Sequence, residues 1–145
     1  MMNTIFRNCR RAALVSGAML LYVAAGALAA DIKVTLSGDQ EVPAVKTPAT
    51  GSGTISVGDD KSVEGSVRTV DMVGSMAHIH EAAPGIRGGI VVGLSAPDGT
   101  GHASGCRSGL DPELITRILT NPAGFYVNVH TTVYPLGAIR GQLDR

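Results

Sequence analysis

Four histidines follow residue 31, and two of them stand close together in the run His78-Ile79-His80. Successive side chains of a β-strand point to opposite faces of its sheet. If this run is a strand, His78 and His80 lie on one face and Ile79 lies on the other. Two imidazoles spaced in this way can reach a single ion, and imidazole is a common ligand of copper and zinc.

A third histidine occupies an equivalent place in the segment FYVNVH, residues 125–130. Alternation along this segment gives one apolar face and one polar face, and the polar face carries Tyr126, Asn128 and His130. If the two segments are neighbouring strands, three neutral imidazoles converge and leave room for a further ligand or a water. We therefore predict a metal site made of His78, His80 and His130. The alternative is that these histidines are solvated side chains on polar strand faces.

Two further side chains are candidates for an additional ligand. Met76 falls on the same face of the expected strand as His78 and His80, and a thioether favours Cu(I). The alternative is that the Met76 side chain fills the core. His102 lies in the glycine-rich stretch GHASGC, residues 101–106. It is either a fourth ligand or a solvated loop histidine.

Two other residues, Glu81 and Arg140, could carry chemistry, and each has a structural explanation. Glu81 follows the histidine pair and is either a base, an acceptor for a ligand histidine, or a solvated carboxylate. Arg140 falls on the polar face of the expected strand 138–143. There it either forms a structural salt bridge or attracts anions near a metal. The sequence contains no nucleophile elbow, Walker loop or dinucleotide fingerprint. We therefore assign no catalytic residue, and an enzymatic role is the less favoured interpretation.

The elements that must position these residues are short and separated by glycine and proline, which is typical of a sandwich or barrel. One helix is expected after Asp111, a good N-cap, with Pro112 at its first position; Asn121-Pro122 ends it. The fold class is therefore all-β, a Greek-key or immunoglobulin-like sandwich or a small barrel with one short helix. The expected strands cover residues 31–37, 54–57, 63–69, 77–81, 90–94, 125–131 and 138–143.

The first thirty residues have the pattern of a secretory leader. Three arginines and no acid precede an apolar run at residues 12–25, and small residues close the leader at 27–30. A twin-arginine signal is a minor alternative. We predict a cleaved signal peptide over residues 1–30, one domain over 31–145, and a periplasmic or secreted location. Removal of the leader also removes Cys9, which leaves Cys106 as the one cysteine of the mature domain. Cys106 is then a free thiol, half of a disulfide between two chains, a metal ligand, or a small side chain in the core.

Charge limits the partners of the mature domain. The sequence has 12 basic and 12 acidic residues, and because three arginines leave with the leader, the mature net charge is about −3. This value offers no electrostatic case for nucleic acid, and no basic amphipathic helix indicates a membrane surface. The expected partner is a metal ion, with a protein as a further option and the oligomeric state left open.

Two segments together resemble a known family. The run AHIH at 77–80, followed by GIRGGIVVGL at 85–94, resembles the first signature of the CHRD domain family. The run GFYVNVH at 124–130, followed by PLGAIRGQL at 135–143, is similar to the second signature. The two signatures occur in the right order around the expected helix.

The resemblance covers roughly residues 32–143, because VTLSG and the following Glu41-Val42-Pro43 are similar to the start of the family. Ala138 departs from the pattern, in which Glu is frequent. The family implies an all-β sandwich or barrel and gives little indication of activity. His78, His80 and His130 fall inside the signatures, whereas His102 does not.

Three functions are compatible with these observations. The favoured one is an exported protein that stores, carries or buffers copper, with zinc as the alternative ion. The second is a metal-free module that binds a protein or glycan. The third is a copper redox enzyme, because an H-x-H pair with a distant histidine is similar to the copper site of Cu,Zn superoxide dismutase. The zinc-binding loop of that enzyme is not evident here, and a shared fold does not transfer a function.

Overall fold

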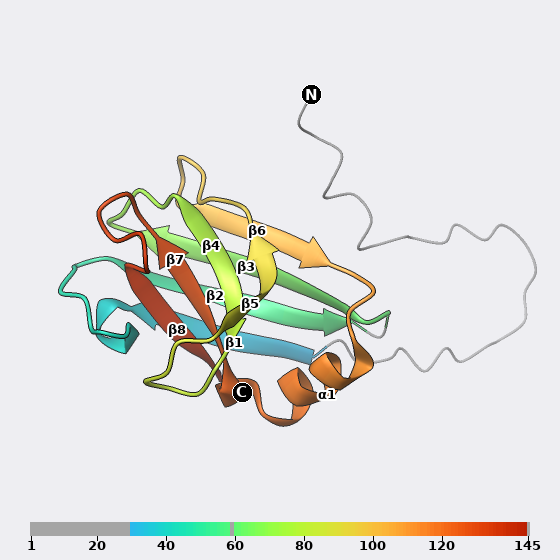
Figure 1. The fold of residues 1–145 in the computed structure, drawn as a ribbon. Coiled ribbons are helices and arrows are strands. Elements are labelled where there is room, and N and C mark those ends of the chain that lie inside the picture. Colours follow the sequence, from blue (N-terminus) through green and yellow to red (C-terminus); the bar gives the residue numbers. More distant parts are fainter. Residues whose placement is uncertain (1–29, 59, 145) are drawn as a thin grey trace, which may run out of the picture.

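The computed structural model describes residues 30–58 and 60–144, so the predicted leader lies outside the described residues apart from Ala30. These residues form an eight-stranded antiparallel sheet in the order β5-β4-β7-β8-β1-β2-β3-β6, shown in Figure 1. The strands are β1 (Ala30–Ser37), β2 (Thr50–Gly58), β3 (Ser62–Val70), β4 (Met76–Glu81), β5 (Gly89–Leu94), β6 (His102–Arg107), β7 (Phe125–His130) and β8 (Ile139–Asp144).

The two end strands of the sheet, β5 and β6, approach each other and nearly close it into a barrel. The amide of Ser95 donates to the carbonyl of Ser104 at 2.8 Å. Gly105 allows this approach, because a Cβ at that position would lie 2.7 Å from the carbonyl oxygen of Gly93 and 2.9 Å from the Cα of Leu94. The fold is therefore all-β with one short helix, as the sequence predicts.

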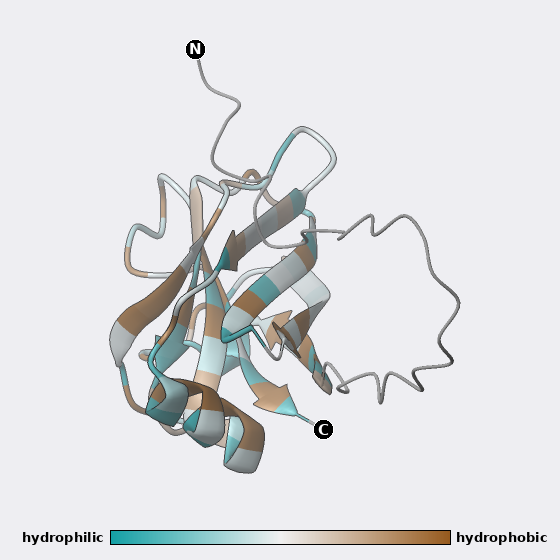
Figure 2. Cartoon of the chain, turned by 90° about the vertical axis from the view of Figure 1, so that its right-hand side faces the viewer, coloured by the Kyte–Doolittle hydropathy of each residue, from teal (hydrophilic) through white to brown (hydrophobic). Residues whose placement is uncertain are grey.

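Apolar side chains alternate along the strands and point into the barrel. On β1, Ile32, Val34 and Leu36 are buried while the residues between them are exposed, which gives the period of two expected of a strand with one solvated face. Figure 2 shows hydrophobic and hydrophilic bands alternating along the strands. On β4, Ala77 and Ile79 point into the same core, so the intervening His78 and the following His80 point outward.

The helix α1 (Pro112–Thr120) lies at one end of the barrel (Figure 1). The side chain of Asp111 caps it by accepting from the amide of Glu113 at 2.9 Å. Leu114 and Ile118 are spaced by four residues and are buried against the core, as one apolar face of a helix requires. Within the described ranges this nine-residue helix is the longest helical element, and no helix there has the length and apolarity of a membrane span.

The structure departs from the expected elements at β6, where the sequence shows only a glycine-rich stretch. Only Ala103 supplies an apolar inward side chain there, so local alternation is too weak to indicate a strand. Pairing with β3, in which Ala103 lies opposite Val67, creates the strand. Cys106 on β6 is half-buried rather than in the core.

Candidate metal centre

Strands β4 and β7 place three histidines side by side on the outer face of the sheet. The two strands are antiparallel neighbours, with His78 opposite Asn128 and Met76 opposite His130. Each of His78, His80 and His130 offers one ring nitrogen, and these nitrogens all lie within 4.8 Å of one another. The convergence predicted from strand parity is therefore confirmed. We call these three residues the histidine trio.

The ring of His78 meets each of the other two rings in a T-shaped, edge-to-face contact. His78 makes an angle of 90° with His80 and of 72° with His130. The Nδ1 of His78 lies 3.1 Å from the Nε2 of His130. Two nitrogens bound to one ion at about 2.0–2.1 Å can be separated by no more than about 4.2 Å. This pair satisfies that limit, and the 4.8 Å bound on the trio requires only a small closure.

Backbone carbonyls fix the orientation of two of the rings. The Nδ1 of His80 lies 3.0 Å from the carbonyl oxygen of Gly88, and the Nδ1 of His130 lies 3.0 Å from that of Pro135. A carbonyl only accepts, so each Nδ1 carries the proton and each Nε2 keeps a lone pair. Such contacts orient the histidines of metal sites. In the described part of the chain, the buried Nε2 of His80 has no hydrogen-bond partner.

The hydrogen bond within the trio also assigns a proton to His78. Because the Nε2 of His130 is an acceptor, the Nδ1 of His78 donates to it. An ion bound between these two nitrogens would displace the proton from Nδ1 of His78. His78 can then carry its proton on Nε2 instead. The ligand atoms available to an ion are therefore Nδ1 of His78 and Nε2 of His80 and His130.

Burial keeps the trio neutral. It is the main cause that lowers the pKa of all three imidazoles below the usual 6.5. Repulsion by His130 lowers the pKa of His78 further. The carbonyls of Gly88 and Pro135 act in the opposite direction on His80 and His130, but burial outweighs them. Neutral imidazole is the form that binds a metal, so the trio is in its binding form at neutral pH.

The additional candidates lie in different places. Met76 is on the same outward face and directly opposite His130, where facing side chains have Cβ atoms about 5 Å apart. It is 46% exposed, so it is not a core residue. His102 is on β6, where its Nε2 lies 3.0 Å from the hydroxyl of Ser66 on β3. It is not part of the trio.

Two sequence-based interpretations need correction. Glu81 is neither a hydrogen-bond acceptor for the trio nor a carboxylate that contacts only solvent. Both its carboxylate oxygens accept from Arg117 of α1, and the shorter contact is 2.7 Å. Arg140 is buried, and within the described residues its guanidinium donates to two carbonyls and to Gln142 rather than to a carboxylate. Carbonyls of loop 82–88 take the place of the carboxylate that the predicted salt bridge requires.

A buried carboxylate near these residues was not singled out by the sequence analysis. Glu41 follows the short helix η1 (Gly38–Gln40) and accepts from the side-chain amide of Asn128 at 2.6 Å. Burial raises the pKa of Glu41 to about 7, although the positive charge of Arg140 opposes the shift. The contact joins residues 87 positions apart, so no local pattern indicates it.

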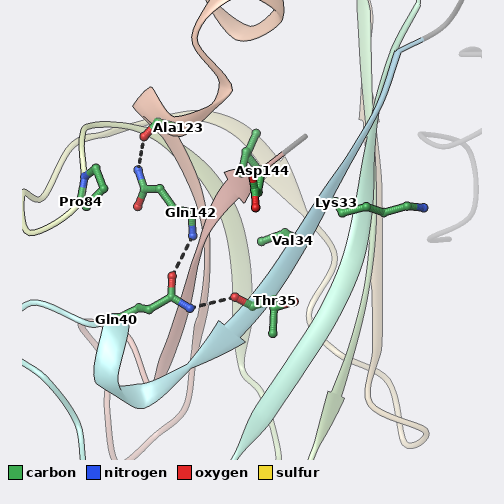
Figure 3. A pocket seen from close by; sticks show the side chains of 9 residues that line it. Lys33, Val34, Thr35, Gln40, Pro84, Ala123, Gln142 and Asp144 are labelled. Atoms are coloured by element: carbon green, nitrogen blue, oxygen red, sulfur yellow. Dashed lines mark hydrogen bonds between the residues drawn. The ribbon is translucent and has the colours of Figure 1, made fainter.

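A pocket lies over β1 and β8, among residues outside the trio, and its lining includes Gln40 and Gln142, which Figure 3 shows joined by a hydrogen bond. Gln142 donates from its side chain to the carbonyls of Ala82 and Ala123, each at 2.7 Å. Gln40 donates to the carbonyl of Thr35 and accepts from the amide of Gln142. Both side-chain amides therefore already bind within the chain, and Gln142 ties Ala82 and Ala123 to β8.

Comparison with known proteins agrees with this picture. The family model of the CHRD domain matches residues 32–143, which is most of the chain. The chain therefore belongs to the CHRD domain family. No curated protein and no solved structure matches it significantly.

Proposed function

We propose that this protein is an exported CHRD protein that binds a copper ion as cargo through His78, His80 and His130, for storage, transport or buffering. The observation that carries the proposal is the convergence of three ring nitrogens within 4.8 Å, with two rings held by backbone carbonyls. The leader-like sequence of the first thirty residues supports a periplasmic or secreted location.

The ligand chemistry supports copper, with zinc as the alternative. Three neutral imidazoles suit either ion. Met76 stands next to the trio and offers a soft thioether, which copper accepts more readily than zinc does. Binding does not require the trio to lose protons to solution at neutral pH, because its pKa values are already lowered.

Titration of the protein with Cu(I), Cu(II) and Zn(II) tests the proposal. We expect one ion per chain, and a loss of affinity of at least a hundredfold in His130→Ala because one of three ligands is removed. His102→Ala is the matched control, since His102 lies on β6 outside the trio. Equal copper affinity in His130→Ala and the wild type would exclude this site. That result would leave the metal-free binding module as the better hypothesis.

A further inference from the structure

A buried cation stands behind the histidine trio. Arg140 of β8 is only 1% exposed. Its guanidinium donates to the carbonyls of Ile86 at 2.7 Å and Ala83 at 3.0 Å. It also donates to the side-chain oxygen of Gln142 at 3.1 Å. Gln142 is itself anchored to Ala82 and, as Figure 3 shows, to Ala123. These contacts fix the position of a positive charge that has no carboxylate bonded to it among the described residues.

An aromatic ring connects this charge to the trio. The guanidinium carbon of Arg140 lies 3.5 Å from the centre of the Tyr126 ring. The other neighbour of Tyr126 is His80, whose ring stacks on it with an interplanar angle of 5° and a centroid distance of 4.7 Å. The cation therefore lies within about 8 Å of the His80 ring. Its charge is one of the influences that lower the pKa of His80, after burial and the repulsion from the other two histidines.

The acidic side chains nearby do not neutralise that charge. Glu41 attracts Arg140, but its pKa is raised to about 7, so it is only partly ionised at neutral pH. Glu81 pairs with Arg117. The trio itself is neutral, and a second cation, Arg87, donates to the carbonyl of Val42 beside Glu41. The fixed charge of Arg140, which acts on the ring of His80, therefore repels a cation bound at the trio.

We propose that Arg140 is a specificity-determining residue that makes the trio favour Cu(I) over the divalent ions Cu(II) and Zn(II). The inference rests on the proposed function, since it requires that the trio binds metal. Coulomb repulsion is proportional to the charge of the ion, so a dication is repelled twice as strongly as a monocation. At about 8–12 Å and an effective dielectric constant of about 20, each unit of ionic charge changes affinity by roughly tenfold. The thioether of Met76, opposite His130, favours the same ion.

The test compares Arg140→Met with Arg140→Lys. Methionine removes the charge while keeping an unbranched side chain, and lysine keeps the charge. We expect Arg140→Met to bind Zn(II) and Cu(II) about tenfold more tightly relative to Cu(I). For a one-electron couple this lowers the Cu(II)/Cu(I) midpoint potential by about 59 mV. Arg140→Lys should keep the wild-type preference and potential.

Competition with a chromophoric chelator gives the affinities, voltammetry gives the potential, and circular dichroism shows that each variant is folded. If neither variant folds, the midpoint potential of copper bound to the wild type still tests the inference. A site that favours Cu(I) must have a potential above that of the aqueous Cu(II)/Cu(I) couple. A folded Arg140→Met with unchanged relative affinities, or a wild-type potential at or below the aqueous value, overturns the inference. Absence of metal binding by the wild type instead overturns the proposed function.

Discussion

The buried carboxyl group of Glu41 makes the stability of the fold depend on pH, and Glu41→Gln should remove that dependence. Burial raises the pKa of Glu41 from 4.5 to about 7, against the attraction of Arg140. The folded protein therefore holds this proton to a higher pH than the unfolded chain does. The stabilising contribution is complete below pH 4.5 and is lost as the pH rises through 7.

The size of the effect follows from the two pKa values. Each pKa unit corresponds to 1.36 kcal/mol, so a shift from 4.5 to about 7 corresponds to about 3 kcal/mol. Glutamine has no charge to lose, and its side-chain oxygen can still accept from Asn128 as Glu41 does. We expect the free energy of unfolding of Glu41→Gln, relative to the wild type, to increase by about 3 kcal/mol between pH 4.5 and pH 8.

Urea denaturation of the metal-free proteins at several pH values between 4.5 and 8 measures this difference. The trio contributes a slope of opposite sign, because its lowered pKa values cause a loss of stability as the pH falls below 6.5. Both proteins contain the trio, so its contribution cancels in the difference. Asp39→Asn, at an exposed carboxylate of η1, shows the effect of removing one negative charge. A difference between Glu41→Gln and the wild type that does not change with pH would refute the reasoning.

Two further substitutions test the contacts around the site and the helix. Gly137→Ala should destabilise the fold by more than 1 kcal/mol in thermal denaturation. Gly137 has a φ of 132°, and a Cβ there would lie 2.3 Å from Asn128 Nδ2 and 2.4 Å from Glu41 Oε1. An unchanged melting temperature would contradict this packing. Asp111→Ala should lower the free energy of unfolding, measured by urea denaturation, by about 1 kcal/mol, since it removes the side chain that caps the amide of Glu113. Glu113→Gln leaves that cap in place and should lower the free energy of unfolding by less.

The histidine trio could be predicted because strand alternation is a local property. In both AHIH and FYVNVH, apolar residues mark the inward positions, so the histidines must share the outward face. The structure adds that β4 and β7 are adjacent, which the sequence analysis had to assume. The expected helix is also confirmed, because its cap, first proline and apolar spacing all lie within Asp111–Asn121.

What sequence reasoning missed depends on contacts between distant segments. Strand β6 forms because it pairs with β3, and Gly105, which disfavours a strand locally, allows β5 to come close. The second face of β7 is expected to be polar, and the sequence does not indicate that all six residues of the strand are buried. Loops cover that face, and they bring Glu41 to Asn128 and place the carbonyl of Ile86 over Arg140.

The candidate site is therefore built at two levels that respond differently to substitution. Adjacent strands fix where the three histidine side chains begin, whereas the carbonyls of Gly88 and Pro135 fix how His80 and His130 are rotated. Gly88 and Pro135 belong to loops outside the strands. A change in either loop can leave every ligand present and still turn an Nε2 away from the ion. Under the proposed function, the affinity for the ion depends on the conformation of these loops as well as on the histidines themselves.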